Sequence, residues 1–139
     1  MGDTEAFARG YVEEFWNKAR DQYVDENFAP EAIYRDPMLP DLPRGPEGAK
    51  QRKATYLSAL SDEHVDIDDI AAGDDTVAVR WTFTGKFTGE FMGSQPTGDT
   101  ITVTGIHFFR IANGRIAEVS TQYDSAGFLS QVGVIDLGG

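Results

Sequence analysis

The sequence predicts an α+β domain in which a curved antiparallel sheet wraps around N-terminal helices. Residues 4–19 and 46–60 carry hydrophobic side chains at three- and four-residue spacing, which is typical of amphipathic helices. From residue 64 onwards hydrophobic and polar residues alternate, which is typical of strands that bury one face. Because the helices come first and the strands follow, an α+β arrangement is favoured. With 139 residues, the chain is expected to form a single domain over 1–139.

The expected elements follow one another with short connections. They are helices over 4–19, 20–27 and 46–60, a brief strand over 32–35, strands over 64–70, 76–85, 100–111 and 115–123, and a closing helix around 127–129. The brief strand has to stop at Asp36-Pro37, because this pair favours a turn. Pro46 suits the first turn of the third helix. Asn113-Gly114 is a typical two-residue turn for the last hairpin.

Alternation along three of the strands predicts which side chains face the core. The inward positions are Val77, Val79, Trp81 and Phe83, then Ile101, Val103, Gly105, His107, Phe109 and Ile111, and finally Ala117, Val119, Thr121 and Tyr123. His107 is thereby placed among apolar neighbours, with Thr121 also pointing inward. A histidine in this position is either a core residue satisfied by one hydrogen bond or a functional group of a pocket.

Composition excludes several classes of function. With 12 Lys and Arg against 23 Asp and Glu, the formal net charge is −11, so neither nucleic acid nor an anionic membrane is an expected partner. The absence of cysteine excludes disulfides, thiolate catalysis and cysteine-ligated zinc, and two histidines are too few for a histidine-rich metal site. No hydrophobic run reaches the roughly 18 to 20 residues of a membrane span, and the acidic N-terminus does not resemble a signal peptide. A cytoplasmic protein is therefore expected.

The second half of the chain carries three groups of closely spaced glycines and polar residues. They are Gly85, Gly89 and Gly93 followed by Gln95-Pro96-Thr97-Gly98; Gly105, His107 and Arg110 followed by Asn113-Gly114 and Glu118; and Asp124, Gly127, Gln131 and Gly133. With these residues the chain resembles, over nearly its whole length, the SnoaL-like polyketide cyclase family of the nuclear-transport-factor-2-like superfamily. The resemblance implies a cone-shaped α+β barrel.

The same resemblance implies cofactor-independent chemistry in an apolar pocket. Characterised members close a ring by an intramolecular aldol reaction, without metal or organic cofactor. Such a reaction needs a poised base, a donor for the developing enolate oxygen and a cavity that excludes water. His107 matches the family's pocket histidine, whereas Thr121, which cannot be a base near neutral pH, stands where the characterised cyclases have their catalytic aspartate. The resemblance also implies a homodimer formed through the outer face of the sheet.

A second resemblance is to the ketosteroid isomerases of the same superfamily. In those enzymes a short strand ends in an aspartate-proline pair whose carboxylate is the base, and Asp36-Pro37 is similar to it. Tyr11 and His107 lie close to the positions of their two oxyanion donors. Asp36 therefore has two interpretations. It caps a turn, or burial raises its pKa toward that of a useful base.

The candidate site combines the inward residues with both resemblances. Its predicted catalytic residues are His107 as acid/base or oxyanion donor, Asp36 as replacement base and Tyr11 as donor to the enolate oxygen. The predicted substrate-binding residues are Tyr34, Trp81, Phe83, Phe109, Thr121 and Tyr123. The expected function is a cofactor-independent polyketide cyclase or isomerase that moves a proton next to the carbonyl of a small apolar molecule. The alternative is a non-catalytic protein of the same fold that binds a small hydrophobic ligand.

Overall fold

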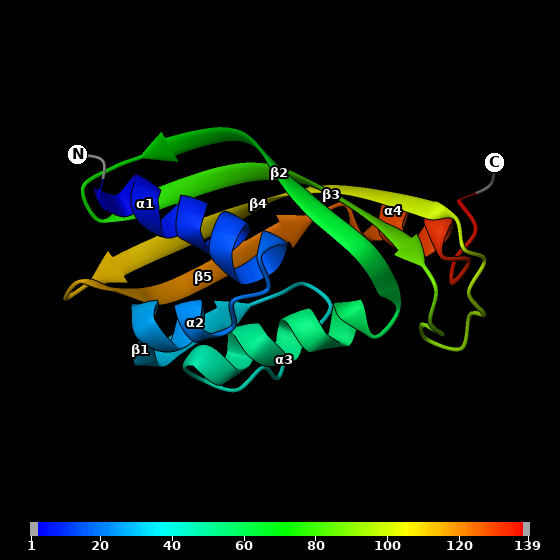
Figure 1. The fold of residues 1–139 in the computed structure, drawn as a ribbon, viewed down its shortest axis with the longest axis horizontal. Coiled ribbons are helices and arrows are strands. Elements are labelled where there is room, and N and C mark those ends of the chain that lie inside the picture. Colours follow the sequence, from blue (N-terminus) through cyan, green and yellow to red (C-terminus); the bar gives the residue numbers. More distant parts are fainter. Residues whose placement is uncertain (1–2, 138–139) are drawn as a thin grey trace.

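The computed structural model describes residues 3–137 of the chain (Figure 1). Its elements in chain order are α1 (Asp3–Gly10), η1 (Tyr11–Asn17), α2 (Gln22–Asn27), β1 (Phe28–Arg35), α3 (Pro46–Leu57), β2 (Leu60–Ala72), β3 (Thr76–Phe87), β4 (Thr100–Ala112), β5 (Arg115–Tyr123) and α4 (Ser125–Gln131). The predicted order of helices first and strands later is confirmed. No helix within these residues is both long and apolar enough to cross a membrane.

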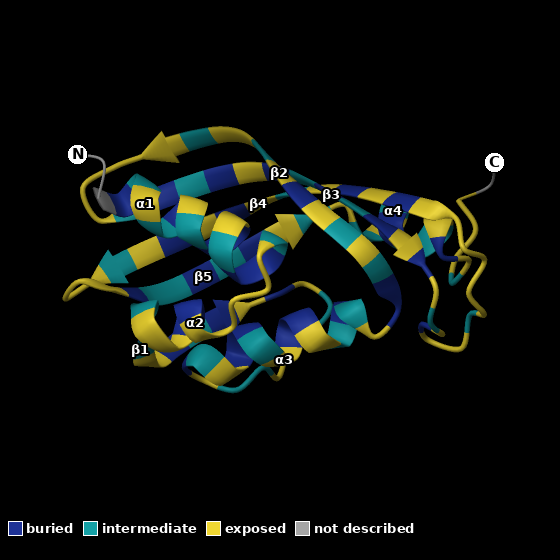
Figure 2. Ribbon diagram, viewed as in Figure 1, coloured by how far each residue is buried: buried dark blue, intermediate teal, exposed yellow. Residues whose placement is uncertain are grey.

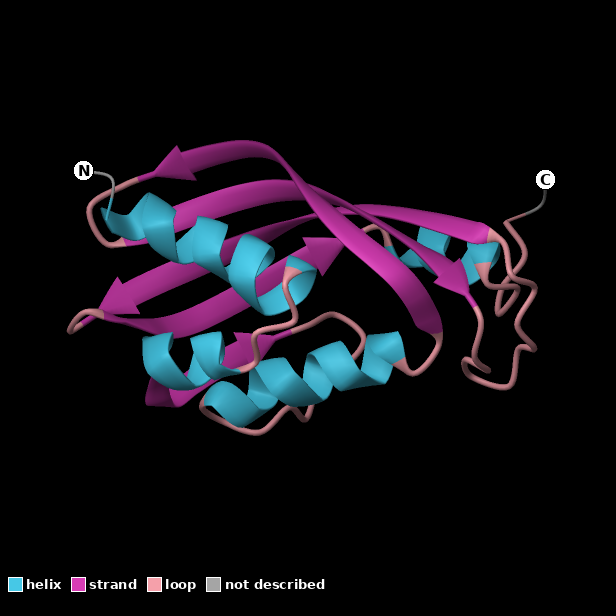
Figure 3. Ribbon diagram, in the orientation of Figure 1, coloured by secondary structure: helices cyan, strands magenta, loops and turns pink. Residues whose placement is uncertain are grey.

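One five-stranded sheet forms the body of the protein, in the order β1-β5-β4-β3-β2. Strands β2 to β5 pair antiparallel, as the hairpin turns predict, but β1 pairs parallel with β5 at the sheet edge. Figure 3 shows the long strands curving over the helices, and the sheet does not close into a barrel. The predicted α+β fold with a curved sheet around N-terminal helices is therefore confirmed, with an open sheet and one parallel edge strand.

The helices α1, η1 and α3 cover the inner face of this sheet. Figure 2 shows the buried residues of these helices turned toward the strands and the exposed ones turned away. The strand residues predicted to face inward form the matching side of the core, from Val77 to Phe83 on β3 and from Ile101 to Phe109 on β4. The period of two along the strands therefore predicted the core face.

The predicted first helix changes its hydrogen-bonding pattern halfway. η1 is a π-helix that continues directly from α1, and it places four buried side chains, Tyr11, Val12, Phe15 and Trp16, on one side. The wider winding of a π-helix changes which backbone carbonyls are bonded within the helix. Lys53 of α3 donates from Nζ to the backbone oxygen of Phe15 at 2.9 Å, and it also pairs with Asp21. This buried lysine connects the π-helix to α3.

Three predicted boundaries differ from the structure by three or four residues: the end of the third helix, the start of β1, and the start of β2, which begins at Leu60 instead of residue 64. The third helix ends at Leu57 rather than at residue 60, because Leu60 already begins β2. β1 starts at Phe28, four residues before the predicted start, and its pairing with β5 shifts register between Phe28 and Ile33. Pro30 falls within this irregular stretch, where a missing backbone N–H is tolerated because β1 is an edge strand.

Candidate functional site

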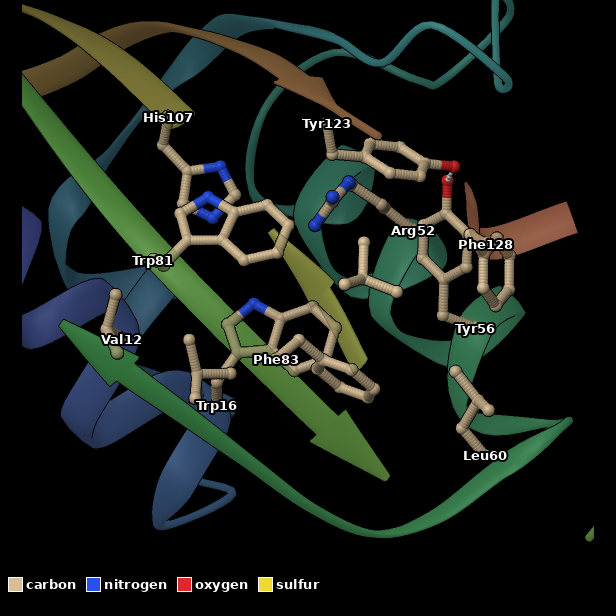
Figure 4. A pocket seen from close by; sticks show the side chains of 12 residues that line it. Val12, Trp16, Arg52, Tyr56, Leu60, Trp81, Phe83, His107, Tyr123 and Phe128 are labelled. Carbon is tan, nitrogen blue, oxygen red and sulfur yellow. Dashed lines mark hydrogen bonds between the residues drawn. The ribbon is translucent and has the colours of Figure 1, made fainter. Parts of the chain in front are cut away.

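A pocket lies between the inner face of the sheet and the helices η1 and α3 (Figure 4). Its lining consists of Val12, Trp16, Arg52, Tyr56, Leu60, Val65, Trp81, Phe83, Val103, His107, Tyr123 and Phe128. Most of these side chains are hydrophobic or aromatic, and the cavity volume is about 50 Å³. A water molecule needs on the order of 10–15 Å³ of such volume, so the cavity has room for a few waters. A ring-sized ligand requires side chains at its edge to move.

Arg52 on α3 is held at the pocket wall by a buried carboxylate. Its Nε donates to Oδ2 of Asp36 at 2.6 Å, and both side chains are almost completely buried. The hydroxyl of Tyr56 lies 3.1 Å from both oxygens of Asp36, and the backbone N–H of Met38 donates to Oδ1 at 2.8 Å. Tyr56 also shares a 2.7 Å hydrogen bond with the hydroxyl of Tyr123. Asp36 therefore has its oxygens engaged and serves to position Arg52.

The guanidinium of Arg52 sits among aromatic rings. Its central carbon is 5.2 Å from the ring centre of Tyr56, 5.3 Å from Tyr34 and 5.8 Å from Trp16, within the range of cation–π attraction. Burial by itself lowers the pKa of Arg52, but the oxygens of Tyr34, Tyr11 and the paired carboxylate raise it above its ordinary value. Arg52 is therefore a permanent buried cation.

A chain of hydrogen bonds runs from His107 into the core. His107 and Thr121 are direct partners across β4 and β5, and Nδ1 of His107 lies 2.7 Å from the hydroxyl of Thr121. Thr121 donates to the hydroxyl of Tyr34 at 3.3 Å, and Tyr34 shares a 2.7 Å hydrogen bond with Tyr11. With its own proton directed to Tyr34, Thr121 accepts the N–H of His107 Nδ1. In that tautomer Nε2 carries no proton and is free to accept one.

The surroundings of His107 keep its imidazole neutral. Burial lowers the pKa of His107 well below 6.5, and the positive charge of Arg52 lowers it further. The ring packs against Trp81 at 5.0 Å between centres and meets Tyr11 edge-on at 5.2 Å. Burial raises the pKa of Tyr34 well above that of a free tyrosine, so this partner of the chain is also neutral. The side chains from His107 to Tyr11 form the inner end of the site, which is uncharged, and each of them has at least one hydrogen-bond partner.

Two donors of the pocket wall have no acceptor. Within residues 3–137, the indole nitrogens Nε1 of Trp16 and Trp81 are buried and make no hydrogen bond. Figure 4 places both indoles in the pocket, with the guanidinium of Arg52 directed toward the Trp81 ring. Buried polar groups are hydrogen-bonded in the great majority of cases. The pocket therefore contains donor capacity that the described part of the protein does not use.

Gly105 provides the space that the Trp81 indole occupies. A Cβ added to Gly105 would lie 2.5 Å from an indole carbon of Trp81, 2.7 Å from the Cβ of Tyr123 and 2.8 Å from the backbone oxygen of Gln122. Only a residue without a side chain fits between these groups. The inward glycine that the strand pattern predicted thus shapes the pocket wall beside His107.

The structure brings together some of the predicted site residues and separates others. Four of them, Trp81, Phe83, His107 and Tyr123, line the pocket. The other five, Tyr11, Tyr34, Asp36, Phe109 and Thr121, are buried behind this lining. Three of these are connected to His107 through the hydrogen-bonded chain, Asp36 is connected to Arg52, and Phe109 packs against the ring of Tyr11 at 5.4 Å. The functional roles predicted for all nine residues stay predictions.

The sequence analysis missed Arg52, Tyr56 and Trp16 as pocket residues. Tyr56 was expected in the buried stripe of its helix, and Arg52 lies four residues earlier, so it falls on the same helical face. A cation within a hydrophobic stripe is the signal that could have identified it. Trp16 lies within the predicted first helix, where aromatic residues at helical spacing are more often core than ligand contacts. Its unbonded nitrogen could not be found from the sequence.

No metal centre is formed by the described part of the chain. Within residues 3–137, no group of three or more His, Asp or Glu side chains lies close enough to hold an ion. His64, the second histidine, is exposed on β2 and pairs with Asp66, as expected for a surface residue.

The curved sheet over the N-terminal helices, with a mostly apolar pocket between them, defines a cone-type α+β fold. The family model for the SnoaL-like polyketide cyclases matches residues 6–132, and the chain belongs to this family. A comparison with curated proteins finds no match.

Solved structures confirm the fold. IdmH, a putative polyketide cyclase from Streptomyces antibioticus, is 29% identical with a TM-score of 0.79, over 94% of this chain and 98% of that one. TsrD from Streptomyces laurentii is 23% identical with a TM-score of 0.82, over 96% of both chains. AclR, a putative hydroxylase from Streptomyces galilaeus, is 24% identical with a TM-score of 0.82, over 97% of this chain and 87% of that one. The fold is therefore that of proteins described with different activities.

Proposed function

We propose that the protein is a cofactor-independent enzyme of polyketide-type chemistry that moves a proton next to a carbonyl, as a cyclase or an isomerase. The observation that carries this proposal is the neutral imidazole of His107 at an apolar pocket, with Nδ1 bonded to Thr121. This hydrogen bond leaves Nε2 as the proton acceptor. A general base must be neutral and within reach of its substrate, and His107 meets the first condition at every pH above its lowered pKa.

The lowered pKa also limits which substrates His107 can activate. A weak base removes a proton only from a fairly acidic carbon, such as one between two carbonyls or one next to both a carbonyl and an aromatic ring. In the proposed step, Nε2 takes the proton and the bonding electrons move onto the carbonyl oxygen as an enolate. The enolate carbon then attacks a second carbonyl, whose oxygen takes the proton back from the imidazolium, or the imidazolium returns the proton to another carbon. The first outcome is cyclisation and the second is isomerisation.

Thr121 takes a positioning role in this proposal. It stands where the characterised cyclases carry an aspartate, and its hydroxyl fixes the ring orientation and tautomer of His107 instead of accepting the substrate proton. Tyr34 and Tyr11 extend this support into the core. In the geometry of the pocket, Asp36 holds Arg52, and the Asp36→Asn variant in the test below decides its predicted role as base. The role of Tyr11 as enolate donor stays a prediction.

The proposal is tested by proton exchange with 2-tetralone, an apolar ketone whose α-carbon lies next to an aromatic ring. In deuterated buffer, proton NMR should record α-deuteration above the buffer rate with the wild-type protein. His107→Ala should reduce the catalysed rate by about 10²- to 10⁴-fold, the usual contribution of a general base. His64→Ala is the matched control, because it removes the other, exposed histidine. Exchange that persists in His107→Ala would contradict the proposal, and undiminished exchange in Asp36→Asn would exclude Asp36 as the base.

A second candidate function is the non-catalytic binding of a small hydrophobic ligand. Two observations favour it, namely the threonine at position 121 and the unused indole donors of the wall. A binding protein of this kind should take up 2-tetralone without any deuteration at its α-carbon. Catalysed deuteration would contradict this second candidate.

A further inference from the structure

The pocket wall carries two buried donors that the fold leaves unused. Nε1 of Trp16 comes from η1 and Nε1 of Trp81 comes from β3, so they reach the pocket from different layers. Leaving a buried N–H without an acceptor costs about 1–3 kcal/mol. The two indoles belong to the same pocket lining as His107. Both indoles line the cavity. The nitrogens themselves are buried, so a ligand that brings acceptor oxygens satisfies them once side chains at the edge of the cavity move.

Arg52 adds a charged donor to the same wall. Within residues 3–137, its recorded hydrogen bond uses Nε alone, which donates to Asp36. The carboxylate lies behind the guanidinium and has no exposed surface, so the ion pair presents its positive end to the cavity. Figure 4 shows the guanidinium of Arg52 directed toward the Trp81 side of the pocket and away from the hydroxyls of Tyr56 and Tyr123. The cavity is thus electropositive although the protein has a formal net charge of −11.

The chemistry of the wall selects among anions. Arg52 is already paired with Asp36, so its attraction for a bound anion is partly cancelled. A compact carboxylate would therefore lose more hydration free energy on entering the pocket than its interaction with Arg52 returns. A phenolate or an enolate spreads its charge over a conjugated system and has a flat apolar body. That body suits the apolar side chains opposite the donors, such as Leu60, Val65 and Val103.

We infer that the pocket binds its ligand in the ionised form, through a phenolate or enolate oxygen on Arg52, with the indole N–H groups of Trp16 and Trp81 donating to further oxygens. This inference deepens the proposed function, on which it rests for the enolate as the relevant ion. It makes Arg52 the residue that selects ionisable, oxygen-rich ligands over neutral apolar ones. It also assigns Asp36 and Tyr56 as positioning residues that hold the guanidinium.

The test uses 4-nitrophenol, a single-ring phenol whose ionised form has its own visible absorption band, and 4-nitroanisole, its neutral methyl ether. At a pH below the pKa of free 4-nitrophenol, addition of the protein should increase the phenolate band, because the pocket stabilises the anion. Calorimetry should give 4-nitrophenol at least about tenfold tighter binding than 4-nitroanisole, which corresponds to the roughly 1.5–3 kcal/mol of a hydrogen bond to a charged group. Binding of the neutral phenol, equal affinity for both probes, or no binding would overturn the inference.

The double variant Asp36→Asn with Arg52→Gln assigns the effect to the ion pair. It replaces both charges by amides of similar shape, so no unpaired charge is buried. The variant should no longer favour the phenolate, so that 4-nitrophenol and 4-nitroanisole bind it with similar affinity. An unchanged preference for the phenolate would overturn the role of Arg52. Since 4-nitrophenol has no proton next to a carbonyl, this test can succeed when the exchange of 2-tetralone fails, and the two failures are distinguishable.

Discussion

The inner end of the site and its pocket wall lie side by side at the inner face of the sheet but differ in how their polar groups are satisfied. From His107 to Tyr11, each side chain of the inner end has a hydrogen-bond partner within the fold. Trp16 and Trp81 in the pocket wall have none within residues 3–137. The difference indicates which polar groups the fold needs for its own stability and which it keeps available for a ligand. Four predictions test this division, from the largest expected effect to the smallest.

The ion pair between Arg52 and Asp36 should contribute the largest effect on stability. Arg52→Ala leaves the Asp36 carboxylate buried without its cation and should lower the free energy of unfolding by about 3–5 kcal/mol. Lys50→Ala, on the same helix, breaks the more exposed pair with Asp25 and should cost no more than about 1 kcal/mol. Urea unfolding of both variants measures the difference. Equal costs would contradict the view that burial makes the Arg52 pair sensitive.

Thr121→Val tests the satisfied inner end. The substitution keeps the shape of the side chain but removes the partner of both His107 Nδ1 and Tyr34, so it should cost about 1–3 kcal/mol of unfolding free energy. Thr104→Val is the matched control, because Thr104 is exposed on the outer face of β4, and it should stay within about 0.5 kcal/mol. If both variants have the same stability, the hydrogen-bonded chain has no structural role.

The pH dependence of stability tests the neutral state of His107. Its folded-state pKa lies below 6.5, so as pH falls the unfolded chain takes up the proton first. The contribution of His107 is therefore constant above about pH 6.5 and is lost below it, by up to about 1.4 kcal/mol per pH unit. Thermal or urea unfolding at a series of pH values, compared with His107→Asn, isolates this slope. An identical slope in the variant would show that His107 titrates normally.

Trp16→Phe should have the smallest effect on the protein without ligand. Removing the unpaired buried N–H should stabilise the fold. Removing part of the indole that packs against Phe83 should destabilise it. Both are on the order of 1 kcal/mol, so the unfolding free energy should change by less than about 1 kcal/mol. Chemical unfolding checks this. A cost larger than that of Thr121→Val would mean that the indole nitrogen has a structural partner.

The parts of the site that lie on strands were predictable, and those that depend on distant contacts were not. The period of two along β4 and β5 places His107 and Thr121 inside, and the hairpin turn at Asn113-Gly114 brings their strands together. The pairing of Asp36 with Arg52 joins two elements with no shared register, so no local pattern contains it. The parallel direction of β1 likewise depends on the path of the chain around α3.

The homodimer, the single domain and the small carbonyl ligand stay predictions. The homodimer implied for this fold would use the outer face of the sheet, where Ile106 and Phe108 of β4 are exposed. The single domain over 1–139 agrees with the one sheet that the described residues form. The expected small carbonyl ligand is the subject of the tests proposed above.

The two tryptophans of the chain, Trp16 and Trp81, both line the pocket. All of the indole emission of this protein therefore originates from the site, with no signal from elsewhere. An indole N–H that gains an acceptor changes its emission wavelength, and a bound aromatic ligand quenches it. The natural fluorescence of the unmodified chain should thus report occupancy of the pocket directly, so that a collection of phenols and diketones could be screened without a label.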